Sequence, residues 1–117
     1  MRKKSGFKYQ IEQKLLSVGF VIIEIGSSDN WWEEERWKIQ SRYDQKVLYY
    51  IYFIIDPQSE SLRDNSPHIY EVRASLMPLT NWNDDSNMIA SITMSKGHFE
   101  IKLNKFTKDI QSYRLAT

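Results

Sequence analysis

The chain has 117 residues, of which 41% are hydrophobic and 26% charged, with a formal net charge of +1 and no cysteine. This length predicts one domain that buries about two thirds of its unfolded surface, and the lack of cysteine excludes disulfides, thiolate catalysis and cysteine-ligated metals. The basic residues 1–4 are not followed by the apolar segment of a signal peptide, and the longest apolar run is too short to span a membrane. These features predict a soluble, cytoplasmic protein with no membrane partner.

The first half of the chain predicts one helix and three strands. Apolar residues spaced four, four and three apart predict a helix over residues 5–18, which Ser5 can cap and Gly19 can end. Residues 20–25 form a short β-rich run. Residues 31–41 are read as a strand, although an aspartate or asparagine cap followed by three glutamates also fits a helix. Residues 47–55 are β-branched, aromatic or aliphatic throughout, which is typical of a strand in the middle of a sheet.

The second half predicts two loops, three strands and a helix. A polar loop spans residues 58–67, and residues 68–77 alternate between apolar and polar side chains as in a strand. A second polar loop, residues 78–87, contains a tryptophan. Residues 88–94 and 99–103 are predicted to form a hairpin around Gly97, whose freedom to adopt positive φ suits a tight turn. Asn104 is then the predicted cap of a closing amphipathic helix.

The order of these elements predicts an α+β fold. It is a two-layer sandwich in which an antiparallel meander sheet of about six strands has the N-terminal and C-terminal helices packed on one face. The whole chain, residues 1–117, is a single domain. Two helices can cover only one side of such a sheet, so the aromatics of the other side must be shielded by loops, by a second copy of the chain or by a partner.

An aromatic sheet face with a few charges suits the binding of another protein. We therefore predict a non-catalytic adaptor-, inhibitor-, immunity- or chaperone-like domain, with a homodimer formed by edge-strand pairing as another use of the same surface. The alternative is that these aromatic residues complete a small second core layer. In that case Glu71 and Arg73 only pair with cross-strand neighbours. The candidate binding residues are Trp31, Trp32, Trp37, Tyr50, Tyr52, Glu71, Arg73 and Trp82.

Two other function classes stay open. The basic ends of the chain predict phosphate contacts in a nucleic-acid-binding protein, with exposed tryptophans that stack on bases. The pI of about 7.9 and the lack of a known nucleic-acid-binding motif weigh against it. An enzyme would have to use His68 or His98, and the sequence has no ligand spacing for a metal and no motif for a cofactor. The residues of the nucleic-acid alternative are Lys3, Lys4, Lys8, Lys102, Lys105 and Lys108.

Overall fold

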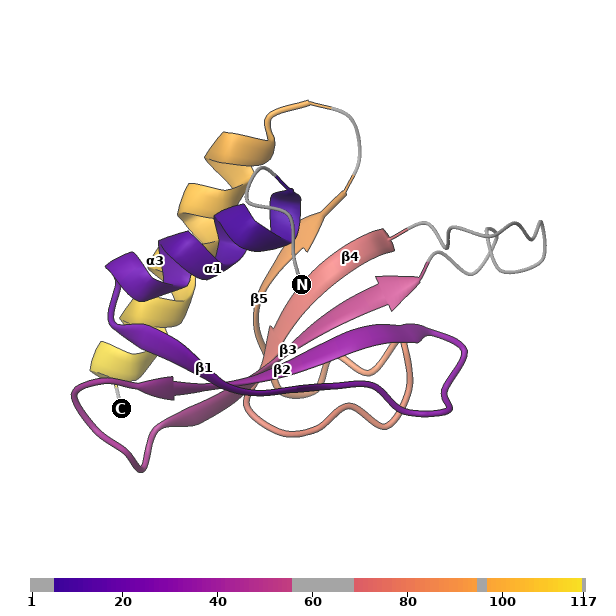
Figure 1. Ribbon diagram of the computed structural model, residues 1–117, viewed down its shortest axis with the longest axis horizontal. Helices are drawn as coiled ribbons and strands as arrows, with labels where there is room; N and C mark the ends of the chain where they lie inside the picture. The colour runs from indigo at the N-terminus through magenta and orange to yellow at the C-terminus, as the bar shows by residue number, and fades with distance from the viewer. Residues whose placement is uncertain (1–5, 56–68, 95–96, 117) are drawn as a thin grey trace.

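The structure, a computed structural model, describes residues 6–55, 69–94 and 97–116 of the chain. Ser5, Lys3, Lys4, His68 and the loop predicted at 58–67 lie outside the described residues. No helix in the described part is long and apolar enough to cross a membrane. The elements are α1 (Phe7–Ser17), β1 (Phe20–Gly26), β2 (Glu33–Ser41), β3 (Leu48–Ile55), β4 (Ile69–Ser75), β5 (Met88–Thr93) and α3 (Phe99–Ala116) (Figure 1).

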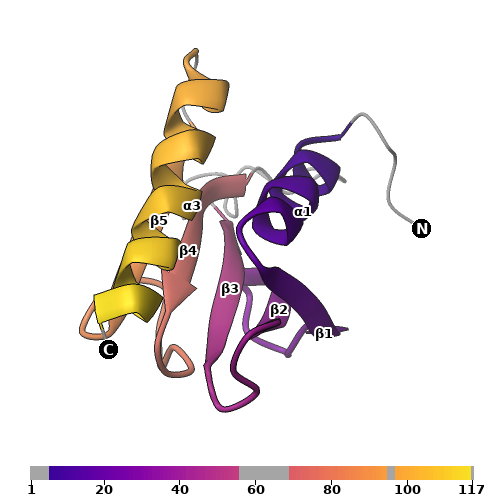
Figure 2. The ribbon, with the colours of Figure 1, turned by 90° about the vertical axis from the view of Figure 1, so that its left-hand side faces the viewer.

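The five described strands form one antiparallel meander sheet in the order β1-β2-β3-β4-β5. β3 is the central strand, as its apolar sequence predicts. Both helices lie on the same side of this sheet (Figure 2), which confirms the two-layer α+β architecture. The main core fills the space between the layers, and its buried residues are Ile11, Leu15, Phe20, Trp37, Ile39, Tyr49, Ile51, Phe53, Val72, Ala74, Ala90, Ile92, Leu103, Phe106 and Ile110.

The predicted strand over residues 99–103 is wrong, because these residues form the first turns of α3. Phe99 and Leu103 belong to a helical stripe that continues through Phe106 and Ile110, with spacings of four, three and four. Ile101, which would share a strand face with Phe99 and Leu103, is 67% exposed instead. The positive-φ turn at Gly97 therefore connects a strand to a helix, and the described sheet has five strands.

The sheet face opposite the helices carries a second, smaller core. Trp32, Tyr52 and Ile54 pack there against Leu79, which belongs to the loop between β4 and β5 (residues 76–87). This loop lies below the sheet in Figure 1, away from the two helices. The sequence predicts that loops, a second copy of the chain or a partner shield this face. In the structure, a loop shields its centre.

A register shift in β2 sets which side chains reach each face. Glu33 lies opposite Ile54 of β3, whereas Glu35 lies opposite Phe53, so the strand bulges between these two glutamates. Since neighbouring residues of β3 point to opposite faces, the bulge places Glu33 on the loop-covered face and Glu35 on the helix face. Strict alternation along residues 31–41 had predicted the same face for both, and that prediction is wrong.

Candidate functional site

The candidate binding residues do not form one surface. Trp37 is fully buried on the helix side of the sheet, 4.8 Å from the ring of Phe53, and its Nε1 donates a hydrogen bond to Glu35. Trp31, which precedes β2, is 42% exposed. The prediction that Trp37 belongs to a binding face is therefore corrected, because a side chain with no accessible surface cannot contact a partner.

Trp32 and Tyr52 are also buried, but beneath the 76–87 loop. Their ring centroids lie 5.9 Å apart, and the Tyr52 hydroxyl accepts a 3.1 Å hydrogen bond from the backbone N–H of Leu79. Burial raises the pKa of Tyr52, while the hydrogen bond from Leu79 acts in the opposite direction. Trp32 and Tyr52 therefore pack beneath the loop and support it, and they are not available to contact a partner.

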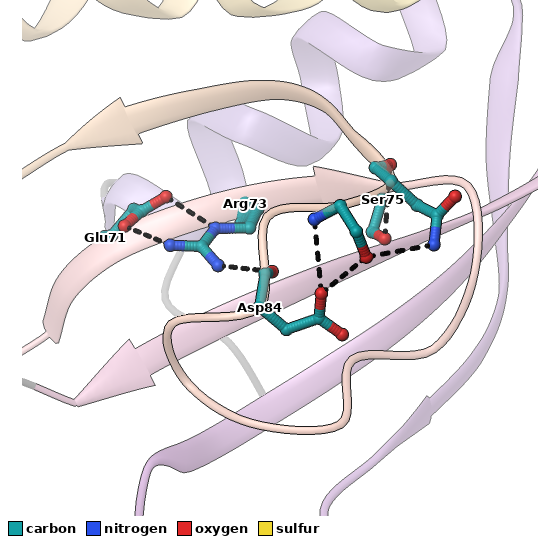
Figure 3. Close-up of polar contacts among 6 residues, drawn as sticks. Glu71, Arg73, Ser75 and Asp84 are labelled. Carbon is teal, nitrogen blue, oxygen red and sulfur yellow. Dashed lines mark hydrogen bonds and ion pairs between the residues drawn. The ribbon is translucent and has the colours of Figure 1, made fainter.

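Glu71 and Arg73 form a buried ion pair on the same face, with each residue only 6% exposed. Arg73 Nε and Nη2 donate to the two Glu71 carboxylate oxygens at 2.7 and 2.8 Å, and Arg73 Nη1 donates to the carbonyl of Asp84 at 2.7 Å (Figure 3). Burial lowers the pKa of Arg73, but the hydrogen bonds and charge of Glu71, together with Asp85 and Tyr70, raise it, and the net direction is upward. The two residues pair with each other along β4 and attach the loop to the sheet.

Asp84 organises the loop from within. Its Oδ2 accepts hydrogen bonds from the backbone N–H and the hydroxyl of Thr80, and its Oδ1 accepts from the backbone N–H and the hydroxyl of Ser86. The Ser86 hydroxyl contributes most, followed by the Thr80 backbone, and together the donors hold the Asp84 pKa well below its usual range. The ionised carboxylate is the form that this turn requires.

Asp84→Asn should therefore destabilise the loop in a pH-dependent way. Because the folded pKa is depressed, the stabilisation is present above the unfolded pKa, about 3.9, and disappears as pH falls through the lower folded value. Urea unfolding should give a less stable variant at pH 7, with a difference from the wild type that shrinks towards pH 3. Asp85→Asn removes the same charge next door and is the control. Equal effects of the two substitutions, or a difference that does not vary with pH, would contradict this role.

A smaller surface remains accessible around the edge of the second core. Tyr50 and Trp82 are half-buried there, packed against Trp32, Tyr52, Ile54 and Leu79. The Lys38 ammonium lies 5.8 Å from the centroid of the Tyr50 ring, and Met77, two residues beyond β4, is 52% exposed. Tyr50 pairs with Ser75, whose hydroxyl donates to the Met77 carbonyl, so the Met77 backbone lies close to Tyr50. We call Lys38, Tyr50, Met77 and Trp82 the Trp82 surface.

The described lysines of the nucleic-acid alternative mostly contact the protein itself. Lys8 bonds to Glu34 and Glu35, the Lys102 ammonium donates to the Thr93 carbonyl, and Lys105 pairs with Asp109 across one helical turn. Lys108 is exposed on α3. These contacts do not bring the basic residues into one phosphate-binding face.

The enzyme alternative rests on two histidines, and one of them, His68, lies outside the described residues. His98 is exposed and adopts a positive φ of 64° immediately before α3. Within the described ranges, no group of three or more His, Asp or Glu side chains is arranged to hold a metal ion.

Sequence reasoning named Tyr50 and Trp82 but did not identify the other residues that form or support the accessible surface. Leu79 and Asp84 lie in a polar loop whose position depends on Arg73, and Lys38 and Met77 gain their role only from sheet register. The one available signal was Trp82, an aromatic residue in an otherwise polar loop. No protein-family model, curated protein or solved structure matches the chain in the three comparisons made.

Proposed function

We propose that the protein is a non-catalytic domain that binds another protein through the Trp82 surface. The observation that carries the proposal is a half-buried tryptophan held at a defined position by a loop that is attached to the sheet. Tryptophan and tyrosine are the residues most enriched among those that dominate binding energy at interfaces. The proposal keeps the aromatic sheet face predicted from the sequence and reduces it to the part that a partner can reach.

The loop is fixed to the sheet at three points around Trp82. The Leu79 N–H donates to the Tyr52 hydroxyl, the Asp84 carbonyl accepts from Arg73, and the Met77 carbonyl accepts a 2.6 Å hydrogen bond from the hydroxyl of Ser75 in β4. A contact residue whose backbone is already ordered loses less conformational entropy when it binds. The buried polar contacts beneath the loop thus support binding indirectly, by presenting Trp82 in one position.

The chemistry of the Trp82 surface indicates the kind of partner. Tyr50, Trp82 and Met77 supply apolar area with limited polar groups, while Lys38 adds one positive charge beside Tyr50. Such a surface complements an apolar patch of a protein that carries a carboxylate at its margin.

Trp82→Ala and Tyr50→Ala should each weaken partner binding by about tenfold or more, because interface hot spots typically contribute at least about 2 kcal/mol. The partner is first identified by placing a photo-crosslinking amino acid at Met77 in cells that naturally express the protein. Its affinity for the wild type and for each variant is then measured by calorimetry.

Trp31→Ala is the matched control, since Trp31 is an exposed tryptophan outside the Trp82 surface. It should leave the affinity unchanged. If Trp82→Ala and Tyr50→Ala keep their fold by NMR and bind every crosslinked partner as tightly as Trp31→Ala does, the Trp82 surface is not the binding site.

A further inference from the structure

A cavity of about 260 Å³ lies at the end of the sheet where the β2–β3 turn meets the last turns of α3. None of its lining residues belongs to the Trp82 surface. Its volume is slightly below the range of pockets for drug-sized ligands, about 300–1,000 Å³, so it suits a molecule about the size of a single ring. The lining residues are Lys46, Val47, Leu48, Tyr49, Leu76 and Tyr113.

Tyr49 is the unusual member of this lining. Its side chain is a core residue, only 3% exposed, and its ring packs against Phe20 and, edge to face, against Tyr113 at 5.8 Å. Buried tyrosine hydroxyls are normally hydrogen-bonded. The Tyr49 hydroxyl makes no hydrogen bond within the described part of the chain, and its oxygen is not among the fully buried polar atoms there, so it keeps some accessible surface. Because Tyr49 lines the cavity, a molecule bound there can supply the hydrogen-bond partner of its hydroxyl.

The charges around Tyr49 indicate what that partner is. Burial and then Tyr113 raise the pKa of Tyr49, whereas the positive charge of Arg114 lowers it, so the hydroxyl is a proton donor at neutral pH. Lys46 lines the cavity, and the Arg114 guanidinium lies over the Tyr43 ring nearby, 5.4 Å from its centroid. The two phenol hydroxyls and the Lys46 ammonium of this lining together favour an anionic acceptor.

The remaining walls are apolar. Val47 and Leu76 are aliphatic residues of this lining, and their side chains offer no hydrogen bonds to water. The lining thus combines polar residues, Lys46 and the two tyrosines, with aliphatic residues. A molecule with an anionic end and an apolar body matches both parts of the lining at once.

We propose that this cavity binds a small carboxylate with an apolar body. The Tyr49 and Tyr113 hydroxyls donate to the carboxylate, Lys46 balances its charge at the cavity mouth, and the body lies against Val47 and Leu76. This site is independent of the protein-binding surface, so either one can fail without the other.

Benzoate is the probe, titrated into the full chain while backbone amide shifts are followed by NMR. We expect saturable shifts confined to residues 46–49, 76 and 113. Benzamide, which has the same shape without the charge, should bind more weakly. Tyr49→Phe and Lys46→Gln should each weaken benzoate binding by about tenfold, as for the loss of a hydrogen bond or contact to a charged group.

Tyr50→Phe is the control, because Tyr50 follows Tyr49 in β3 and points to the opposite face. It should bind benzoate as the wild type does. Lys46 is exposed, so Lys46→Gln tests the site even if Tyr49→Phe disturbs the core. Absence of saturable shifts at tens of millimolar benzoate would mean that the cavity holds water only and would overturn the proposal. Equal affinities of Lys46→Gln, Tyr49→Phe and the wild type would also overturn it.

Discussion

Arg73→Met should lower the free energy of unfolding by about 3–5 kcal/mol, because it leaves the Glu71 carboxylate buried without its counter-charge. The loss has a second component. Arg73 Nη1 also bonds to the Asp84 carbonyl, so the substitution removes one of the three attachments of the 76–87 loop. We expect amides of this loop to lose protection against hydrogen exchange before the rest of the sheet does.

Chemical denaturation followed by circular dichroism measures this effect, and Lys105→Met provides the matched control. Lys105 pairs with Asp109 at 2.8 Å, but its side chain is 77% exposed, and exposed pairs contribute about 0–1 kcal/mol. The double variant Glu71→Leu/Arg73→Met should recover most of the lost stability, since a buried pair can be replaced by apolar residues at little cost. If Arg73→Met is no more destabilising than Lys105→Met, the Glu71–Arg73 pair does not hold the loop.

The sequence predicted most of the architecture because the patterns involved are local. The apolar stripe of α1, the uniformly apolar β3 and the alternation in β4 each identify an element from a few consecutive residues. The error at residues 99–103 has the same origin. Phe99 and Leu103 fit a strand with Ile101 between them, and they equally fit a helix that continues to Phe106. Only a longer stretch of sequence, which includes Phe106 and Ile110, distinguishes the helical period from the strand period.

The candidate site was harder to predict because its parts come from distant segments. Alternation along β2 fails at the bulge between Glu33 and Glu35, and no residue in that run marks where the bulge falls. The cover over Tyr52 depends on Leu79, which lies 27 positions away in sequence. A loop with two leucines and one tryptophan among mostly polar residues gives little sign that it folds back under the sheet. The sequence therefore grouped the aromatic residues together but could not separate the buried members from the accessible ones.

Trp37→Ala tests that sorting most directly, and it should reduce the free energy of unfolding by about 3–5 kcal/mol. The indole is fully buried between the sheet and the helices, in contact with Phe53, so its removal leaves a large cavity in the main core. It also removes the 2.6 Å hydrogen bond that Trp37 Nε1 donates to Glu35. The lost packing and the lost hydrogen bond both reduce the stability of the fold, and neither removes a contact with a partner.

The measurement is urea unfolding of Trp37→Ala beside Trp31→Ala, which should stay within about 0.5 kcal/mol of the wild type because Trp31 is exposed. A loss of 3–5 kcal/mol is a large part of the 5–15 kcal/mol that stabilises a typical domain. Trp37→Phe, which keeps an aromatic ring, is therefore included as a milder variant with an intermediate loss. Near-equal stabilities of the Trp37 and Trp31 variants would contradict the burial of Trp37 and would support the prediction, made from the sequence, that it lies on a binding surface. A much lower stability of Trp37→Ala than of Trp31→Ala would confirm that Trp37 is a core residue. Trp82 and Tyr50, on the sheet face opposite the helices, would then remain as the aromatic residues proposed to bind a partner.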